Sequence, residues 1–311
     1  MNSPAPAHRV DGPVWAGIIT LWFVWGSTYL AIANVVTEMP VLLSIGLRYL
    51  TAAVVLATFI AIRRGPRALL CPKKHWQRAA LEGVLLIGAG NGSVCLSEQH
   101  VPSGVVAIIV SMMSVWVALL RARFSERPAS RTLLGVLVGL AGVGLIVFSG
   151  EHTTTGGSAL TRTLWSLAVV AGSLGWACGS FFGSRIAPQR DALVGTVWQM
   201  TVGGSLMLVV GLITGERVSH ADHFSALAWW SLLYLVVIGS LVGQTSFTWL
   251  ISSGAPLSLV ATYSYVNPIV AVLLGVLFRS EPIDPKALMG GAIVLGAVAM
   301  VVRGESRKPG S

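Results

Sequence analysis

The sequence predicts an all-α integral membrane protein in which ten transmembrane helices form two inverted five-helix repeats. Three observations predict this fold class: the composition, a succession of apolar runs and an internal duplication. Of the 311 residues, 54% are hydrophobic and only 11% are charged, whereas a soluble domain carries about 25% charged residues. The mean hydropathy is +0.76. Lipid is therefore expected to solvate most of the chain.

Ten apolar runs have close to the length that a membrane span needs, which is about 20 residues. Short loops rich in glycine, proline and charged residues separate them. Because the first run is longer than the apolar region of a signal peptide, we interpret it as an uncleaved span. The predicted spans cover residues 14–35, 42–62, 79–99, 102–122, 132–149, 164–184, 193–213, 228–249, 256–278 and 287–303.

Positive charges are distributed unequally between the two sides of this ten-span chain. Of the 21 Lys and Arg residues, 16 lie on the side of the termini, four lie on the opposite side and Arg48 lies inside the second span. Because cytoplasmic loops carry the excess of positive charge, both termini are predicted to be cytoplasmic. Topology thus accounts for the net charge of +9. The predicted partner is the lipid bilayer, and no nucleic-acid partner is needed.

The chain also resembles itself at a nearly constant offset. Motifs of the first half recur 151 to 155 residues later, which indicates a duplication with repeats at 1–150 and 151–311. Each repeat holds five spans, and because five is odd, the second repeat must be inserted upside down. Such repeats are typical of secondary transporters, in which the substrate site lies near the bilayer midplane and access alternates between the two sides. The matching pairs are "VLLIGAGNG" (84–92) with "YLVVIGSLVG" (234–243), "WGSTY" (25–29) with "CGSFF" (178–182), and "SERPASRTLLG" (125–135) with "SEPIDPKALMG" (280–290).

Four stretches carry a family resemblance: "WGSTYLAI" (25–32), "GNGSVCLSEQHVPSG" (90–104), "GSLGWACGSFFGSRI" (172–186) and "ATYSYVNPIVAVLLG" (261–275). They resemble the EamA family of the drug/metabolite transporter superfamily, and its YedA-type inner-membrane exporters in particular. The resemblance implies a ten-helix exporter of small metabolites, amino acids or drugs in the plasma (inner) membrane, without naming the substrate. Ser114 departs from the family pattern, which has a proline at that place.

Aromatic residues lie near the middle of two spans that correspond between the repeats. Trp25 is close to the centre of the span 14–35, and Trp22 and Tyr29 lie on the same helical face. Trp176 lies at a similar depth in the second repeat. Because tryptophan in membrane proteins usually lies at the interface, we predict that these side chains line a substrate cavity. The alternative is ordinary packing between helices.

Polar groups beside a helix break are the second set of predicted substrate-binding residues. Pro268, which we assign to gating, lies inside the ninth run and removes the hydrogen bond to the carbonyl of Ser264. Such a carbonyl persists only inside protein or beside a watery cavity. Tyr263 and Asn267 share the face beside this break, and the alternative is a structural kink in which Asn267 satisfies the backbone. Asn91 needs a polar partner, which is either substrate or another helix.

Two charged residues toward the outer ends of their spans are further candidates for gating or coupling. Arg48 lies six residues into the second span and Glu98 lies at the end of the third. Charges at such depth are functional candidates because they are costly to bury. Our hypothesis is an outer Arg48–Glu98 ion pair that breaks when the carrier opens outward. A second hypothesis couples transport to protonation of Glu98. The alternatives are that Arg48 reaches lipid headgroups or Glu38, and that Glu98 faces water.

Several other classes of function are disfavoured by missing motifs. The sequence contains no GxSxG, HExxH or P-loop motif, and its six histidines lie in loops or at span edges. We therefore predict no catalytic residue, metal site or cofactor, and rank an intramembrane enzyme below a transporter. A passive facilitator or channel is the alternative to secondary transport. Glycines in the fifth and tenth spans either pack within the protein or form a homodimer face.

Overall fold

The computed structural model describes residues 12–124, 130–148, 158–186, 191–218, 223–253, 255, 260, 262–281 and 285–306. Every regular element within these ranges is a helix, as the sequence predicts. The expected boundary between the repeats, at residues 150 and 151, lies outside the described residues.

Seven helical stretches are long and apolar enough to cross a membrane. Two of them, the third and the seventh, each contain a π-helical segment, η2 and η4, between two α-helices. A short 3₁₀ helix, η1 (Pro66–Leu69), links the second stretch to the third. The seven stretches are formed by α1 (Gly12–Val36), α2 (Val41–Arg64), α3 (Lys73–Glu82) with η2 (Gly83–Asn91) and α4 (Gly92–Ser97), α5 (Ser103–Val110) with α6 (Met113–Phe124), α8 (Ala159–Ile186), α9 (Ala192–Ile213), and α10 (Ala226–Tyr234) with η4 (Leu235–Gln244) and α11 (Thr245–Ser252).

Three further helices contain shorter apolar segments: α7 (Ser130–Phe148), α13 (Tyr263–Arg279) and α14 (Pro285–Ser306). They fall on the predicted fifth, ninth and tenth spans. Within the ninth predicted span, α13 begins at Tyr263, and the described Val260 before it is also helical. Residues 256–259 and 261 of that predicted span lie outside the described part of the chain.

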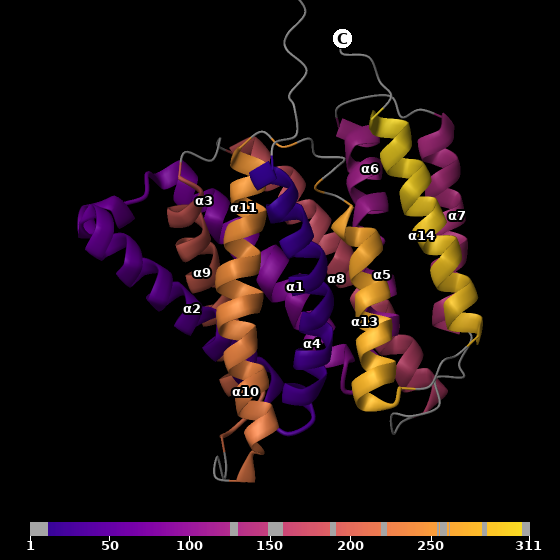
Figure 1. Cartoon of the computed structure of the whole chain (residues 1–311), viewed down its shortest axis with the longest axis horizontal. Coiled ribbons are helices and arrows are strands. Elements are labelled where there is room, and N and C mark those ends of the chain that lie inside the picture. Colours follow the sequence, from indigo (N-terminus) through magenta and orange to yellow (C-terminus); the bar gives the residue numbers. More distant parts are fainter. Residues whose placement is uncertain are drawn as a thin grey trace, which may run out of the picture.

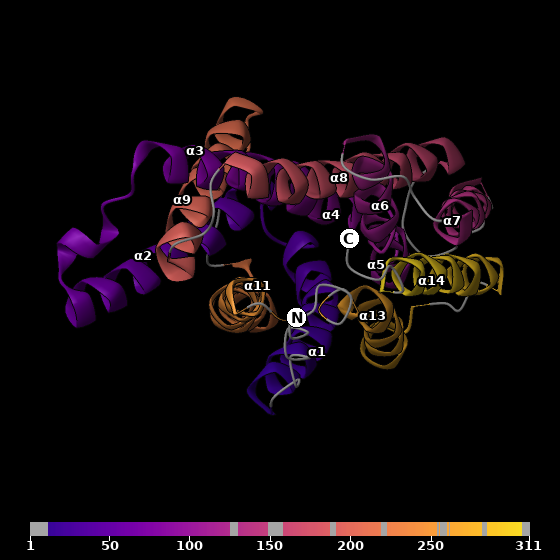
Figure 2. The same cartoon turned by 90° about the horizontal axis from the view of Figure 1, so that it is seen from above.

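The helices pair between the two halves of the chain. At one end of the molecule α7 packs against α14, and at the other α2 packs against α9 (Figure 1). Seen from above, α1 lies between α11 and α13, with α4 and α8 behind it (Figure 2). The middle of the molecule is therefore enclosed by helices from both halves.

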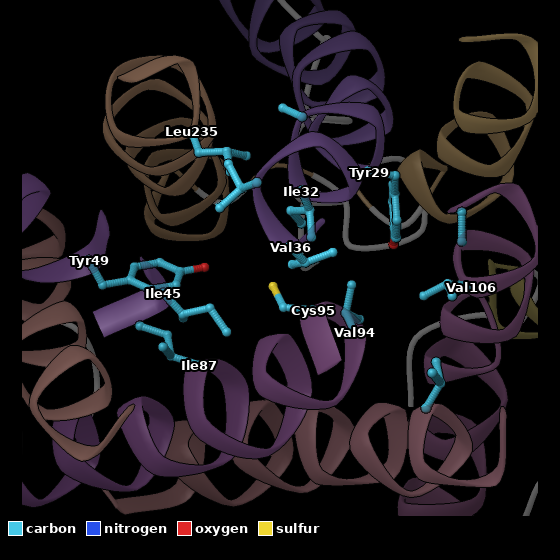
Figure 3. Packing of buried hydrophobic residues seen from close by; sticks show 14 of the residues in the cluster. Tyr29, Ile32, Val36, Ile45, Tyr49, Ile87, Val94, Cys95, Val106 and Leu235 are labelled. Atoms are coloured by element: carbon cyan, nitrogen blue, oxygen red, sulfur yellow. The ribbon is translucent and has the colours of Figure 1, made fainter. Parts of the chain in front are cut away.

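The outer surface carries the apolar side chains that a lipid-solvated protein needs. Ile62, Ile213 and Leu277 are 78%, 79% and 72% exposed. In water such exposure would be costly, whereas lipid tails solvate these side chains without penalty. Inside, Ile32 of α1, Ile45 of α2 and Cys95 of α4 converge in a buried apolar cluster (Figure 3).

Carboxylates in loops tie together helix ends that are distant in sequence. Glu216 accepts hydrogen bonds from the backbone N–H groups of Leu42 (3.1 Å) and Leu43 (2.9 Å) at the start of α2. Glu38 accepts from the backbone N–H (2.6 Å) and hydroxyl (2.7 Å) of Ser225, just before α10. These bonds satisfy N–H groups that have no partner within their own helix, and the helix dipole favours the negative charge. The bonds from Ser225 hold the pKa of Glu38 below its usual value.

Candidate functional site

A central cavity of about 80 Å³ lies between helices of the two halves, which is room for several water molecules. Its walls come from α1, α2, η2, α4, α5, α6, α8, η4 and α13, together with the α5–α6 junction. Two of the predicted site residues, Trp22 and Glu98, are not among the residues that line it. Eight are: Trp25, Tyr29, Arg48, Asn91, Trp176, Tyr263, Asn267 and Pro268.

Trp25 is the centre of an aromatic cluster at this cavity. Its ring contacts Trp176 edge-on at 6.0 Å between centroids, Phe247 at 5.2 Å and Tyr263 at 5.1 Å. The four rings come from α1, α8, α11 and α13, so the cluster joins both halves of the chain. Sequence reasoning missed Phe247, which lies near the end of an apolar run where an aromatic residue has no distinguishing feature.

Trp22 corrects the expectation that the whole aromatic face of α1 lines the cavity. Its indole Nε1 donates to Thr262 Oγ1 at 3.0 Å, so it packs beside the start of α13. Trp22 lies almost one turn before Trp25, about 4.5 Å along the helix axis. Both tryptophans pack against the apolar cluster that contains Ile18 and Leu21, but only Trp25 also lines the cavity.

Glycines stand behind both cavity tryptophans. A Cβ on Gly243 would lie 2.5 Å from Nε1 of Trp25, and a Cβ on Gly90 would lie 2.7 Å from Cε3 of Trp176. Any larger residue would therefore displace the indole. Both glycines belong to the motifs that the two repeats share. This repetition was the available signal, but it did not reveal that the glycines face the tryptophans.

The variant Gly243→Ala is expected to move Trp25 and to destabilise the protein by about 1–3 kcal/mol through overpacking. Gly144→Ala is the matched control, because a Cβ at Gly144 meets nothing within 4 Å. The measurements are thermal stability in detergent and transport per folded molecule. Similar results for the two variants would contradict the tight contact between Gly243 and Trp25.

The start of α13 brings several predicted polar residues into hydrogen bonds. In the orientation that satisfies its amide, Asn267 donates to the carbonyls of Trp22 (3.0 Å) and Tyr263 (3.1 Å). Ser114, the residue that departs from the family pattern, donates to the hydroxyl of Ser264 at 3.1 Å. The nitrogen of Asn267 is thus engaged by backbone carbonyls, but these belong to Trp22 and Tyr263 and not to Ser264, whose helical hydrogen bond Pro268 removes. Pro268 nevertheless lines the cavity beside it.

The hypothesised Arg48–Glu98 ion pair is not formed in this structure. Arg48 turns toward η4 instead, where its Nε donates to Ser240 Oγ at 2.8 Å, and its guanidinium lies 4.7 Å from the ring centroid of Tyr49. Glu98 is buried, and neither of its carboxylate oxygens has a hydrogen-bond partner. In this structure Arg48 and Glu98 are 4% and 5% exposed, so the Arg48 side chain lies inside the protein and Glu98 is enclosed by it.

Comparisons with known proteins show the family and the fold of this chain. The model of the EamA-like transporter family matches the chain twice, at residues 14–148 and 163–303. The inner membrane transporter YedA of Escherichia coli is 30% identical over 294 residues, which cover 94% of this chain and 92% of that protein. A solved crystal structure with 19% identity superposes with a TM-score of 0.65 and covers 92% of this chain and 95% of that one, so it shares the fold.

The names of two further relatives specify the class of compound that they export. The "Probable terminal-alkyne amino-acid exporter" of Streptantibioticus cattleyicolor is 26% identical and covers 95% of each chain. The "Probable amino-acid metabolite efflux pump" of Salmonella typhimurium is 25% identical and covers 90% of this chain and 92% of its own. With the family model matched along both halves and YedA similar over nearly the full length, the chain belongs to the EamA-like transporter family and is a membrane transporter.

Proposed function

We propose that this protein is a secondary transporter that exports small organic metabolites, such as amino acids, amines or drugs, by alternating access. The observation that carries the proposal is the central cavity, whose wall is shared by helices of both halves and contains Trp25 and Trp176 in contact with each other. Relatives named as amino-acid exporters or efflux pumps support the cargo class. The membrane we propose is the plasma (inner) membrane, as for YedA.

Several features support ten spans in two inverted repeats, at 1–150 and 151–311. The family model matches each half separately. The π-helical segments η2 and η4 start at Gly83 and Leu235, within the offsets that relate the repeated motifs. A tryptophan of the first half, Trp25, lies against Gly243 of the second, and a tryptophan of the second half, Trp176, lies against Gly90 of the first, within two residues of the positions that the repeated motifs align. A two-fold relation between the halves produces such reciprocal contacts.

Alternating access is supported by contacts between the halves at both ends of the cavity. At one end Arg279 donates to Asn34 Oδ1 at 2.7 Å, and Ser103 donates to Glu281 at 2.8 Å. Toward the other end, Ile18 and Leu21 are buried in the same apolar cluster as Leu250 and Val260. A carrier that rocks one half against the other breaks one set of contacts while it keeps the other.

Topology reporters test the proposed orientation. Fusions after Arg78, Arg131 and Arg190 are expected to report the cytoplasm, and fusions at His152 and His220 the opposite side, because positive charge is retained inside. A fluorescent and an alkaline phosphatase reporter at each site give opposite readings. Labelling of residues 63–78 from outside would contradict the proposed orientation.

Counterflow in proteoliposomes tests the proposed activity. The purified protein is reconstituted with unlabelled amino acids inside, and uptake of the same labelled compounds is followed. A carrier is expected to show saturable uptake that exceeds equilibrium while the internal pool lasts. Flux that never exceeds equilibrium and does not saturate would instead identify a passive facilitator or channel.

A further inference from the structure

We propose that Arg48 is the group that recognises the substrate and that the substrates carry a carboxylate. This inference rests on the proposed function, because it assigns a cargo class to the same central cavity. Arg48 is the single charged side chain among the described residues that line this cavity. The cavity is therefore positive and otherwise bounded by neutral groups.

The Arg48 side chain is held in place, but not all of its hydrogen-bond donors have an acceptor. It is 4% exposed, its Nε is bound by Ser240 and the ring of Tyr49 lies against its guanidinium. Its Nη1 atom, however, is buried without any hydrogen-bond partner. A buried cation with an unused donor is costly, and a ligand that supplies an acceptor removes that cost.

The site is also shaped around the guanidinium. A Cβ on Gly239 would lie 3.0 Å from Nη2 of Arg48, so the absence of a side chain there leaves the head group its space. Gly239 and Ser240 both belong to η4, and π-helical segments recur at functional sites. The second half of the chain thus orients Arg48 of the first half in two ways. Ser240 accepts a hydrogen bond from it, and Gly239 leaves space for its guanidinium.

The remaining polarity of the cavity favours an anion over a cation. No carboxylate is found among the described lining residues, and Arg48 forms no ion pair with the part of the chain that the structure describes. Another lining residue, Trp176, has a buried indole N–H without a partner. The two groups without a partner, Nη1 of Arg48 and Nε1 of Trp176, are both hydrogen-bond donors, and an ionised carboxylate only accepts hydrogen bonds. An ammonium ion would leave both donors unsatisfied and would be repelled by Arg48.

Two matched series of probes, in which one member lacks the amine and another has the carboxylate replaced by an amide, test this inference. The first series is L-leucine, 4-methylpentanoate and L-leucinamide, and the second is L-phenylalanine, 3-phenylpropionate and L-phenylalaninamide. Binding to the purified full-length protein is measured by thermal stabilisation as a function of probe concentration. We expect the acids of at least one series to bind at least about tenfold more tightly than the amide, which is the effect of one charge-assisted hydrogen bond.

Variants on α2 connect this preference to the arginine. Arg48→Gln is expected to lose the acid preference, and Arg48→Lys to keep a weaker one, because lysine retains the charge but not the planar donor pair. Arg63→Gln is the matched control, since Arg63 lies on the same helix, exposed and away from the cavity. If Arg48→Gln does not fold, the inference is judged from two other measurements. These are the preference of the wild type for acids over amides and the weaker preference expected of Arg48→Lys.

Three results would overturn the inference: amides that bind as tightly as acids, no binding of any acid to the wild type, or an unchanged acid preference in Arg48→Gln. Counterflow with the labelled probes separates this inference from the proposed function. Acids that bind through Arg48 without being transported would support the inference and contradict export. Transport of the amides without binding of the acids would support export and overturn the inference.

Discussion

Trp25→Ala is expected to lower transport per folded molecule by at least about tenfold. The indole contacts three other rings at the cavity, and each aromatic contact contributes about 0.5–1.5 kcal/mol beyond its area. Together they amount to more than the 1.4 kcal/mol that corresponds to tenfold. Without the indole, Trp176 and Tyr263 lose the partner that aligns them, and the wall between the halves opens. Trp25→Phe is expected to recover part of the activity.

Trp230→Ala is the matched control for this substitution. Trp230 lies in the middle of α10 and is 69% exposed, so its removal changes a lipid-facing surface and leaves the cavity intact. We expect it to reduce the amount of inserted protein more than the transport rate. The comparison uses initial uptake rates divided by the folded fraction from size-exclusion chromatography. An equal loss of rate in both variants would contradict an aromatic cavity.

A cross-link between residues 34 and 279 is expected to stop transport almost completely. Asn34 and Arg279 join α1 to α13 through a 2.7 Å hydrogen bond at one end of the cavity, and Arg279 also lies 3.9 Å from Glu281. If this end must open in each cycle, a covalent link across it holds the carrier in one state. The experiment replaces Cys71, Cys95 and Cys178, introduces Asn34→Cys with Arg279→Cys, and applies a bifunctional thiol reagent of matching length.

Two controls accompany the cross-link. Each single cysteine variant treated with the same reagent reports the effect of modification alone, and reduction of the link in the double variant is expected to restore uptake. Cross-linked protein that transports at the rate of the reduced protein would show that the two halves do not separate at this end. Alternating access through the contact between Asn34 and Arg279 would then be wrong.

Much of the cavity wall could be predicted from the sequence because a membrane leaves few explanations for certain residues. Trp25 and Trp176 lie near the middle of their predicted spans, where tryptophan is unusual. Pro268 frees a backbone carbonyl that lipid cannot satisfy. Asn91 carries an amide that needs a partner. Depth and chemistry alone therefore selected residues that the structure brings to one cavity.

Side-chain partners could not be predicted in the same way. Arg48 and Glu98 were paired because both lie toward the same end of consecutive spans, yet Arg48 bonds to Ser240, which is 192 residues away. Trp22 was grouped with Trp25 by helical spacing, yet it bonds to Thr262. Spacing fixes which face of a helix a residue shares, but not which neighbour that face meets.

The sequence by itself determined the helical class, the positions of the apolar runs, the duplication and the family. These follow from local properties, because a span must be apolar over its length and must satisfy its backbone internally. The tertiary structure decided the direction of the Arg48 guanidinium, the unpartnered burial of Glu98 and the placing of glycines behind the tryptophans. These depend on how helices from the two halves are rotated and packed against each other, and contacts between small and large residues across that interface set the rotation.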